Sequence, residues 1–436
     1  MTRLTRRRLA LAAATAAVLV TATACSSSGS ASDAGKPITL SFLSYNYGTP
    51  DTGGQGTQDL IDAFEKANPT IKIKPEGVAI ADALTRVRTD TAAGSPPDVA
   101  QVGWSKLAAA YGTLPLTPVQ DIPPAAEWHS ATTGMSQPML KAVEHDGKVA
   151  AMPYTISTPT LFYNATLFTK AGLDPKRPPT TIDEARTDGL AIAKTGTSGV
   201  YFDIANASKS DFLTQSVIAS NGGSLVSMDG KVTFDQQPAV EALTAMQQLT
   251  KSGAQPAVGE NDAIAAFKAG KLGMLVTSTA LLSSLEAAAQ GSFDLRTAAM
   301  PGFTGKPAHT TFSGAGLIVL AKDQARRQAA WQFIKFLTSA QGFTIITSKI
   351  GYLPLRPDLV RDPNYLAPYY RKDARIGPAL TQLDSVTPYT FFAGNQAAQA
   401  VATLQDDAVE PIVLHGADPA STLAKVAKQI RSMTGQ

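Results

Sequence analysis

Apolar and polar positions alternate with two different periods in the first quarter of the chain. A period of two predicts strands over residues 38–45, 71–73 and 98–102, and apolar positions at helical spacing predict helices over 60–67 and 84–87. Proline or glycine follows each helical pattern and marks the turn to the next element. The order strand, helix, strand, helix, strand predicts a parallel sheet covered by helices.

The same two periods return in the rest of the chain, without a short repeat of the solenoid or propeller kind. The expected strands are 149–152, 160–163, 273–277 and 316–320. The expected helices are 182–193, 238–250, 264–268, 328–337, 396–406 and 423–430. A chain of about 400 residues exceeds one ordinary core, so two domains are expected. The predicted fold class is α/β, with two lobes, a hinge, and a mostly parallel sheet flanked by helices in each lobe.

Two such lobes facing one another form a cleft, and ligands of open α/β sheets bind at the carboxyl ends of the strands. We expect the chain to cross between the lobes near Pro153, Thr310 and Pro354. The predicted lobes are 37–152 plus 311–353 and 153–310 plus 354–436.

The first 24 residues have the pattern of a secretory signal peptide. Four arginines precede an apolar run over 9–20, which is shorter than the roughly 20 residues that span a bilayer. Small residues then lead to Cys25, the only cysteine, and residues 22–25 resemble a bacterial lipobox. We expect lipid on Cys25 and a flexible tether over 25–36; the alternative is a plain signal peptide with an incidental cysteine. Ordinary secretion and twin-arginine export both fit the clustered arginines.

The net charge of +3 comes from 38 basic and 35 acidic residues. Four of the basic residues precede Cys25, so the chain from Cys25 onward has 34 basic and 35 acidic residues. This balance gives no reason to expect a nucleic-acid partner. The histidines show no metal-ligand spacing; they are His129, His145, His309 and His415. Neither a G-x-S-x-G motif nor a phosphate-binding G-x-x-x-x-G-K-[ST] motif occurs. We expect no metal, no cofactor and no enzymatic activity, although missing motifs alone do not exclude an enzyme, because catalytic carboxylate pairs have no fixed spacing.

Several segments, in the right order, resemble the family 1 extracellular solute-binding proteins of ABC importers. They are 94–99, 152–164, 168–175, 178–181, 267–274, 330–338 and 351–354. The resemblance covers nearly all of the chain after Cys25. It implies a monomer, held at the outer face of the cytoplasmic membrane by its lipid, that closes around a small ligand by a hinge motion. Its partners would be the permease subunits of the importer, with a separate ATPase.

Within that family, residues 157–159 and 351–354 are most similar to the binders of glycerol-3-phosphate and glycerophosphodiesters. The residues that this resemblance places at the ligand are Ser157, Ser278 or Thr279, Gly314 and Tyr352. Trp104 falls where those binders carry an acidic residue, and Phe392 falls near their phosphate-binding arginine. A phosphate favours a charged fork of the arginine kind. An aromatic residue in its place indicates a neutral ligand such as a sugar.

A sugar pocket combines aromatic faces with a few oriented polar groups. Trp104 follows a predicted strand and offers such a face, or else it is a core tryptophan at the start of a helix. Tyr45 and Tyr47 end the first predicted strand at the expected cleft, and one of the two is expected only to pack. Asp203 is a hydroxyl partner or a solvated loop residue. Phe392 either stacks on the ligand or fills the core of the second lobe.

Three other functions stay open. A glycerol-3-phosphate or glycerophosphodiester binder would need Lys209 or Arg371 in place of the missing arginine. A lipid-anchored glycoside hydrolase would need two close carboxylates in the cleft. A sensory or adhesive binding protein would share the fold and lack a transporter.

Overall fold

The computed structural model describes residues 37–48, 53–383, 386–387 and 389–436. The predicted signal peptide, Cys25 and the whole predicted tether therefore lie outside the described residues. Within the described part of the chain, no helix combines the length and the apolar character that crossing a membrane requires.

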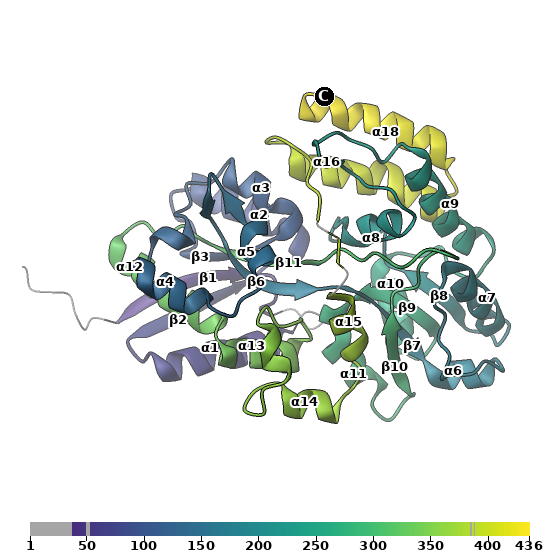
Figure 1. The fold of residues 1–436 in the computed structure, drawn as a ribbon, viewed down its shortest axis with the longest axis horizontal. Helices are drawn as coiled ribbons and strands as arrows, with labels where there is room; N and C mark the ends of the chain where they lie inside the picture. The colour runs from purple at the N-terminus through teal and green to yellow at the C-terminus, as the bar shows by residue number, and fades with distance from the viewer. Residues whose placement is uncertain (1–36, 49–52, 384–385, 388) are drawn as a thin grey trace, which may run out of the picture. The chain divides into compact units, whose positions relative to one another are not determined.

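The first sheet has five strands in the order β2-β1-β3-β11-β6 (Figure 1). The strands are β1 (Ile38–Ser44), β2 (Ile71–Gly77), β3 (Val99–Gly103), β6 (Met152–Ser157) and β11 (Ser313–Val319). β1 is parallel to β2 and β3, whereas β11 is antiparallel to both of its neighbours, β3 and β6. In this sheet only β11 runs against the other strands, so the predicted parallel arrangement of the first three strands is confirmed.

The second sheet has four strands in the order β10-β7-β9-β8. The strands are β7 (Pro159–Asn164), β8 (Ser198–Phe202), β9 (Leu272–Ser278) and β10 (Leu295–Ala299). β8 is parallel to β9, and β7 is antiparallel to β9 and β10. In this sheet β7 is the strand that runs antiparallel to the other three. A separate two-stranded ladder is formed by β4 (Glu144–His145) and β5 (Lys148–Val149).

A nearly continuous extended segment connects the two sheets. β6 ends at Ser157 in the first sheet and β7 begins at Pro159 in the second, with only Thr158 between them. Figure 1 shows β6 as a long arrow that leads out of the first sheet. The chain returns to the first sheet between β10 and β11. The exact limits of the two lobes stay a prediction.

Helices follow most strands and cover the sheets. In the first third of the chain they are α1 (Gly54–Ala67), α2 (Ala83–Ala92), α3 (Trp104–Tyr111), α4 (Ala125–Thr132) and α5 (Gln137–Ala142). The middle third contributes α6 (Ala165–Lys170), α7 (Ile182–Ala193), α8 (Phe212–Ser220), α9 (Gln237–Lys251), α10 (Glu260–Lys268) and α11 (Leu282–Ala289). The last third contributes α12 (Gln324–Leu337), α13 (Ala340–Ile345), α14 (Ala367–Lys372), α15 (Gly377–Gln382), α16 (Ala397–Leu404), α17 (Glu410–His415) and α18 (Pro419–Thr434).

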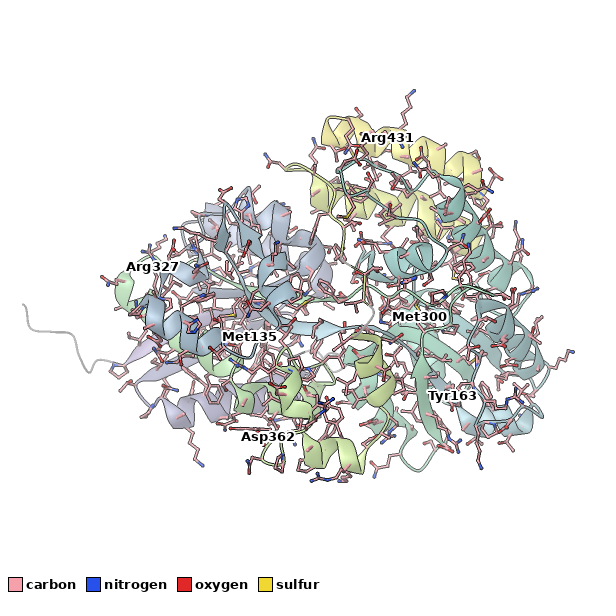
Figure 2. All side chains as sticks on the ribbon, viewed as in Figure 1. Met135, Tyr163, Met300, Arg327, Asp362 and Arg431 are labelled. Carbon is pink, nitrogen blue, oxygen red and sulfur yellow. The ribbon has the colours of Figure 1, made fainter. Side chains whose placement is uncertain are left out.

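Local sequence signals explain where several of these helices begin. Thr181 and Glu184 form a reciprocal capping box at the start of α7, which satisfies two backbone N–H groups that the helix leaves unpaired. At α12 the side chain of Asp323 accepts a hydrogen bond from the N–H of Arg326. The last helix, α18, is held by Arg431, labelled in Figure 2, whose guanidinium donates to Asp235 at 2.7 and 2.9 Å.

The core of the first sheet is built where α1 and α12 meet β1. Phe333 of α12 packs against Phe42 of β1 and Phe64 of α1, with ring centroids 5.1 and 4.9 Å apart. All three rings are buried. These aromatic contacts fix the helices against the strand whose carboxyl end enters the site described below.

A buried carboxylate ties α12 to the same strands. Asp98, at the start of β3, accepts hydrogen bonds from the N–H and hydroxyl of Ser41 at 2.8 and 2.9 Å and from the guanidinium of Arg326, Nε at 2.7 Å. Burial by itself raises the pKa of Asp98, but the hydrogen bonds from Arg326 and Ser41 outweigh it and hold that pKa below its usual value. The carboxylate is therefore ionised in the folded protein at neutral pH.

We expect Asp98→Ala to lower the free energy of unfolding by about 3 kcal/mol, because it leaves the partly buried Arg326 without its partner. Urea denaturation at pH 7 measures this difference. The control is Asp62→Ala, which removes an exposed carboxylate from α1 and should change stability by less than about 0.5 kcal/mol. Equal effects of the two substitutions would contradict the assignment of Asp98 as a structural anchor.

Candidate functional site

A pocket of about 130 Å³ lies where strands of both sheets end. From the first sheet it receives Tyr45 after β1, Trp104 after β3 and Ser157 at the end of β6. From the second it receives Asp203 after β8 and Ser278 at the end of β9. These are carboxyl ends of strands, the place where open α/β sheets bind their ligands.

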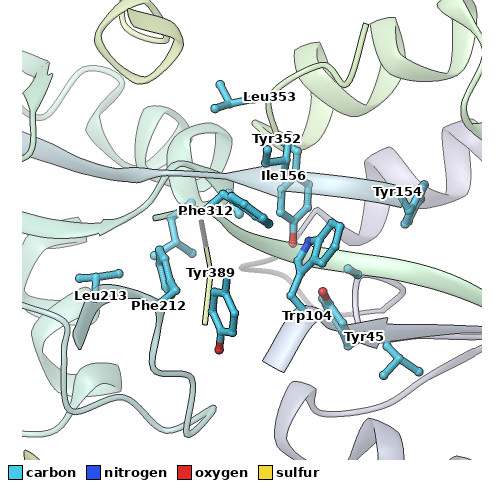
Figure 3. Close-up of a cluster of buried hydrophobic side chains, with 14 of the residues drawn as sticks. Tyr45, Trp104, Tyr154, Ile156, Phe212, Leu213, Phe312, Tyr352, Leu353 and Tyr389 are labelled. Carbon is cyan, nitrogen blue, oxygen red and sulfur yellow. The ribbon is translucent and has the colours of Figure 1, made fainter. Parts of the chain in front are cut away.

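Trp104 forms one wall of the pocket. It is the first residue of α3, its side chain is only 1% exposed, and its ring meets that of Phe312 edge to face at 5.2 Å. The indole N–H donates to the carbonyl of Thr155 at 3.3 Å. Figure 3 shows Trp104 in a cluster that also includes Tyr45 and Tyr352. Both interpretations of this tryptophan therefore have support, because it is buried and also lines the pocket.

Two tyrosines from distant parts of the chain stand beside Trp104. The hydroxyl of Tyr45 donates to the carbonyl of Gly314 at 3.4 Å. Tyr352 follows Gly351, whose φ of 106° is in the left-handed region that favours glycine. Burial raises the pKa of both phenols, so both are neutral at physiological pH and keep a hydroxyl hydrogen.

Gly314, at the beginning of β11, has no room for a side chain. Its φ is 144°, and a Cβ at this position would lie 1.9 Å from the carbonyl oxygen of Thr155 and 2.9 Å from Nε1 of Trp104. The neighbouring Ser313 pairs with Ser157 in the register of β11 and β6. Glycine at position 314 thus allows β11 to lie close to the Thr155 carbonyl and to the indole ring of Trp104.

The second sheet contributes mainly polar groups. Asp203 is 4% exposed, and its Oδ2 accepts a hydrogen bond from the hydroxyl of Thr277 at 2.7 Å. Burial, and then the charge of Glu260, raise the pKa of Asp203 well above its usual value. The Asn206 side chain organises the adjoining loop by bonding the N–H and the carbonyl of Ser210 at 2.9 and 2.7 Å. The Ser278 hydroxyl accepts a hydrogen bond from the N–H of Ala280 at 3.2 Å.

The structure brings seven of the nine predicted ligand residues to this pocket. They are Tyr45, Trp104, Ser157, Asp203, Ser278, Gly314 and Tyr352. Tyr47 lies at a different hollow with Gly48 and the start of α1, because a turn after β1 redirects the chain. Phe392 is buried against Phe234, with ring centroids 6.3 Å apart, and does not line the pocket. Neither of these two residues lines the pocket, and their role at the ligand stays a prediction.

Other residues at the pocket carried no clear signal in the sequence. They include Ser105, Lys106, Ser208, Ser210, Phe212 and Glu260. Glu260 begins α10 and reads as an ordinary acidic residue in the first turn of a helix. Lys106 lies two residues after Trp104 on the same short helix. Its ammonium donates to the carbonyls of Ile80 and Ala81 at 3.2 and 2.8 Å, which the sequence alone does not predict.

No arginine lines the pocket among the described residues. The two suggested replacements for the missing arginine lie elsewhere: Lys209 forms ion pairs with Asp406 at 2.6 Å and Glu410 at 3.4 Å, and Arg371 is exposed on α14. Within the same residues, no group of three or more histidine, cysteine, aspartate or glutamate side chains is placed to hold a metal ion.

Comparisons with known proteins agree with this architecture. Residues 59–372 match the family described as bacterial extracellular solute-binding protein. A putative binding protein of Brucella abortus is 25% identical over 374 residues, which cover 83% of this chain and 87% of that protein. The sn-glycerol-3-phosphate-binding periplasmic protein UgpB of Salmonella typhimurium is 24% identical and covers 87% and 89% of the two chains.

Solved structures show the same fold. The acarbose-binding GacH receptor of Streptomyces glaucescens superposes with a TM-score of 0.77 at 21% identity, covering 92% of this chain and 99% of the receptor. UgpB of Mycobacterium tuberculosis, solved with glycerophosphocholine, gives a TM-score of 0.77 at 24% identity, covering 91% and 98%. The predicted two-lobe α/β fold is thereby confirmed.

Proposed function

The chain belongs to the family of bacterial extracellular solute-binding proteins, and we propose that it captures a carbohydrate or carbohydrate-like polyol and delivers it to the permease of an ABC importer. The observation that carries this proposal is the composition of the pocket. Aromatic side chains and hydroxyl groups from the strand ends of both sheets line it, and no arginine does so among the described residues.

The chemistry of a sugar suits these groups. Trp104 and the two tyrosines offer aromatic surface for the C–H faces of a sugar ring, and the tyrosine, serine and threonine hydroxyls offer donors and acceptors for its edges. Lys106 is the cation at this pocket, and its ammonium already donates to two backbone carbonyls. These groups support an uncharged ligand.

A glycerol-3-phosphate or glycerophosphodiester ligand is the second candidate. It is favoured by the relatives and the structural neighbour whose names carry those ligands. Phe392 packs in the core and does not line the pocket, so its aromatic ring does not by itself exclude a phosphate ligand. The feature that favours a neutral ligand is the pocket lining, which contains no arginine among the described residues.

A glycoside hydrolase is a poorer fit. Asp203 and Glu260 both line the pocket, where burial and then the charge of Glu260 raise the pKa of Asp203. Glycosidases hold their two carboxyl groups about 5–5.5 Å or about 6.5–9.5 Å apart, with the sugar between them. The family and the structural neighbours that match this chain are binding proteins, which favours capture of a solute over hydrolysis.

The proposed mechanism is closure around the ligand. A ligand that contacts both sheets binds the closed arrangement more tightly than the open one. The difference between the two binding free energies is the amount by which the ligand stabilises the closed arrangement. The pocket volume of about 130 Å³ is below the roughly 300–1,000 Å³ of typical ligand pockets, so entry of a sugar requires a hinge movement. The closed protein would then present a surface to the permease, and a separate ATPase would supply the energy.

Export, lipid on Cys25, anchoring to the outer face of the cytoplasmic membrane and a monomeric state belong to the same proposal.

A thermal-shift screen of the chain from residue 33 onward tests the ligand class. The panel contains glucose, maltose, maltotriose, glycerol-3-phosphate and glycerophosphocholine. A ligand present at about 100 times its Kd stabilises the folded state by about 2.7 kcal/mol, which is a clear shift in melting temperature. We expect a shift with a sugar. A shift with the two phosphates alone would make the second candidate the function.

A further inference from the structure

The loop between β8 and α8 provides part of the pocket wall, and one of its residues has an unusual backbone conformation. We call residues 206–210 the pocket loop, because three of its residues line the pocket: Asn206, Ser208 and Ser210. Lys209 belongs to the same loop and has a φ of 53°. Among the described residues, Asp146 is the only other non-glycine residue with a positive φ. The pocket loop therefore contains a conformation that is rare in this chain.

The two residues with a positive φ differ in how easily they adopt it. Asp146 lies in the turn between β4 and β5, and an aspartate tolerates the left-handed region because its short polar side chain bonds to the nearby backbone. Lys209 ends a turn in which its N–H donates to the carbonyl of Asn206 at 3.1 Å. Glycine is favoured at the last position of the commonest turn type, and a residue with a Cβ is strained in the left-handed region. Strain of this kind persists where the surrounding structure holds the residue in place, and such residues gather at functional sites.

Two carboxylates from the C-terminal helices hold Lys209. Its ammonium lies 2.6 Å from Oδ1 of Asp406 and 3.4 Å from Oε2 of Glu410. Asp406 is in the π-helical turn Gln405–Val409, which separates α16 from α17, and Glu410 is the first residue of α17. The side chains of all three residues are between 33% and 49% exposed, so dissolved salt can screen both ion pairs.

The other contacts of the pocket loop determine its internal shape. The Oδ1 atom of Asn206 accepts hydrogen bonds from the N–H of Ser210 at 2.9 Å and from the hydroxyl of Ser208 at 2.6 Å. The N–H of Ala207 donates to Oε2 of Glu260 at 2.6 Å. The ion pairs of Lys209 connect the loop to α17 and to the π-helical turn instead.

Lys209 and its two partners lie outside the lining of the pocket. The side chains that line it from this loop belong to its neighbours, and neither Asp406 nor Glu410 reaches the pocket. Any effect of these three charges on a bound solute therefore passes through the position of the pocket loop.

We propose that Lys209 is a positioning residue, whose ion pairs with Asp406 and Glu410 hold the pocket loop in the conformation that binds the solute. This inference rests on the proposed function and adds a means by which its site is kept ready for the ligand. Without the ion pairs the strained loop relaxes, and a smaller fraction of the molecules is competent to bind. The apparent Kd rises by the factor by which that fraction falls.

Removal of one partner outside the pocket tests this coupling. The ligand is the sugar among glucose, maltose and maltotriose that gives the largest thermal shift, titrated by calorimetry at pH 7 in 0.01 M NaCl. Asp406→Asn should weaken its binding about two- to fivefold, the value of one exposed ion pair. The matched control is Asp407→Asn, which removes the adjacent exposed carboxylate and should keep the wild-type affinity. Equal affinities of these two variants would overturn the proposal.

Substitutions of Lys209 separate the ion pairs from the strain. Lys209→Met keeps the aliphatic stem and the strain but loses both pairs, so binding should weaken about three- to tenfold. Lys209→Arg keeps the charge and should stay within about twofold of the wild-type protein. Lys209→Gly loses both pairs and also the strain, because glycine adopts a left-handed φ readily, so it should bind more tightly than Lys209→Met. Equal losses in Lys209→Gly and Lys209→Met would contradict the role assigned to the strain.

The salt dependence of binding is a measurement that a purely structural role of Lys209 would not change. Raising NaCl from 0.01 to 1 M shortens the Debye length from about 30 to about 3 Å. An uncharged sugar has no charge to be screened, so wild-type affinity should fall toward that of Lys209→Met, which should itself stay constant. Lys231→Met is the control, because Lys231 pairs with Asp229 at 2.8 Å away from the pocket and its loss should leave the wild-type salt dependence intact. A wild-type affinity that is independent of salt would overturn the proposal.

Hydrogen exchange of the ligand-free protein separates this inference from the proposed function. The N–H groups of Ala207, Lys209 and Ser210 are hydrogen-bonded, and they should exchange faster in Asp406→Asn but not in Asp407→Asn. If this result is found and no sugar binds, the proposed ligand class is wrong and the positioning of the loop stands. If a sugar binds while exchange and affinity in Asp406→Asn equal those of the wild-type protein, solute binding stands and the role of Lys209 is wrong.

Discussion

Gly314→Ala should destabilise the protein by more than about 3 kcal/mol and abolish ligand binding in whatever fraction still folds. The new Cβ would lie 1.9 Å from the carbonyl oxygen of Thr155, a separation that forces β11 away from β6. A left-handed φ adds about 1–2 kcal/mol for a residue with a side chain. The displacement would also disturb Trp104, whose indole nitrogen lies 2.9 Å from the same Cβ position, and the hydrogen bond from Tyr45 to the Gly314 carbonyl.

Urea denaturation and sugar titration of the purified variant measure the two effects. Gly291→Ala is the matched control, because Gly291 has a φ of 73° and nothing within 4 Å of its Cβ position. It should lose only the backbone contribution of about 1–2 kcal/mol and keep its affinity. If Gly314→Ala behaves like this control, the close approach of β6 and β11 does not shape the pocket.

Much of the fold could be predicted because its signals are local. Ile38, Leu40 and Phe42 alternate as β1 requires, and Leu60 and Phe64 recur as α1 requires. The antiparallel direction of β11 could not be predicted in this way. An apolar run has the same pattern in either direction, and β11 owes its place to pairing with β3 and β6, which are far away in the sequence.

In the candidate site, too, some residues could be predicted from local signals and others could not. Tyr45 and Trp104 end strands, so their pattern and the rule for α/β sheets together predict their position. The prediction that Tyr352 and Gly314 lie at the ligand came from the resemblance to a family, because no periodicity in the sequence marks these two residues. Glu260 was missed since an acidic residue in the first turn of a helix is common for local reasons alone. For Phe392 the sequence left two roles open, because an aromatic residue outside a regular pattern suits a core as well as a ligand.

Trp104→Ala and Trp331→Ala should lower stability to a similar extent and differ in ligand binding. Both tryptophans are buried, at 1% and 0% exposure, and truncating a buried tryptophan costs about 3–5 kcal/mol. Trp331 lies on α12, where its indole N–H donates to Glu127 at 2.8 Å and its ring packs on Trp128 at 5.8 Å, and it does not line the pocket. Trp104 lines the pocket and positions Phe312 and the Thr155 carbonyl beside it.

For these reasons we expect sugar affinity to fall at least about thirtyfold in Trp104→Ala, the size of a binding hot spot, and to change little in Trp331→Ala. Isothermal titration well below the melting temperature measures this, since the fitted stoichiometry reports the folded fraction and the Kd describes the molecules that are folded. Equal losses of affinity would mean that global destabilisation explains both. Unchanged affinity in Trp104→Ala would make Trp104 a core residue that only borders the pocket, and the aromatic surface for the ligand would then have to come from Tyr45 and Tyr352.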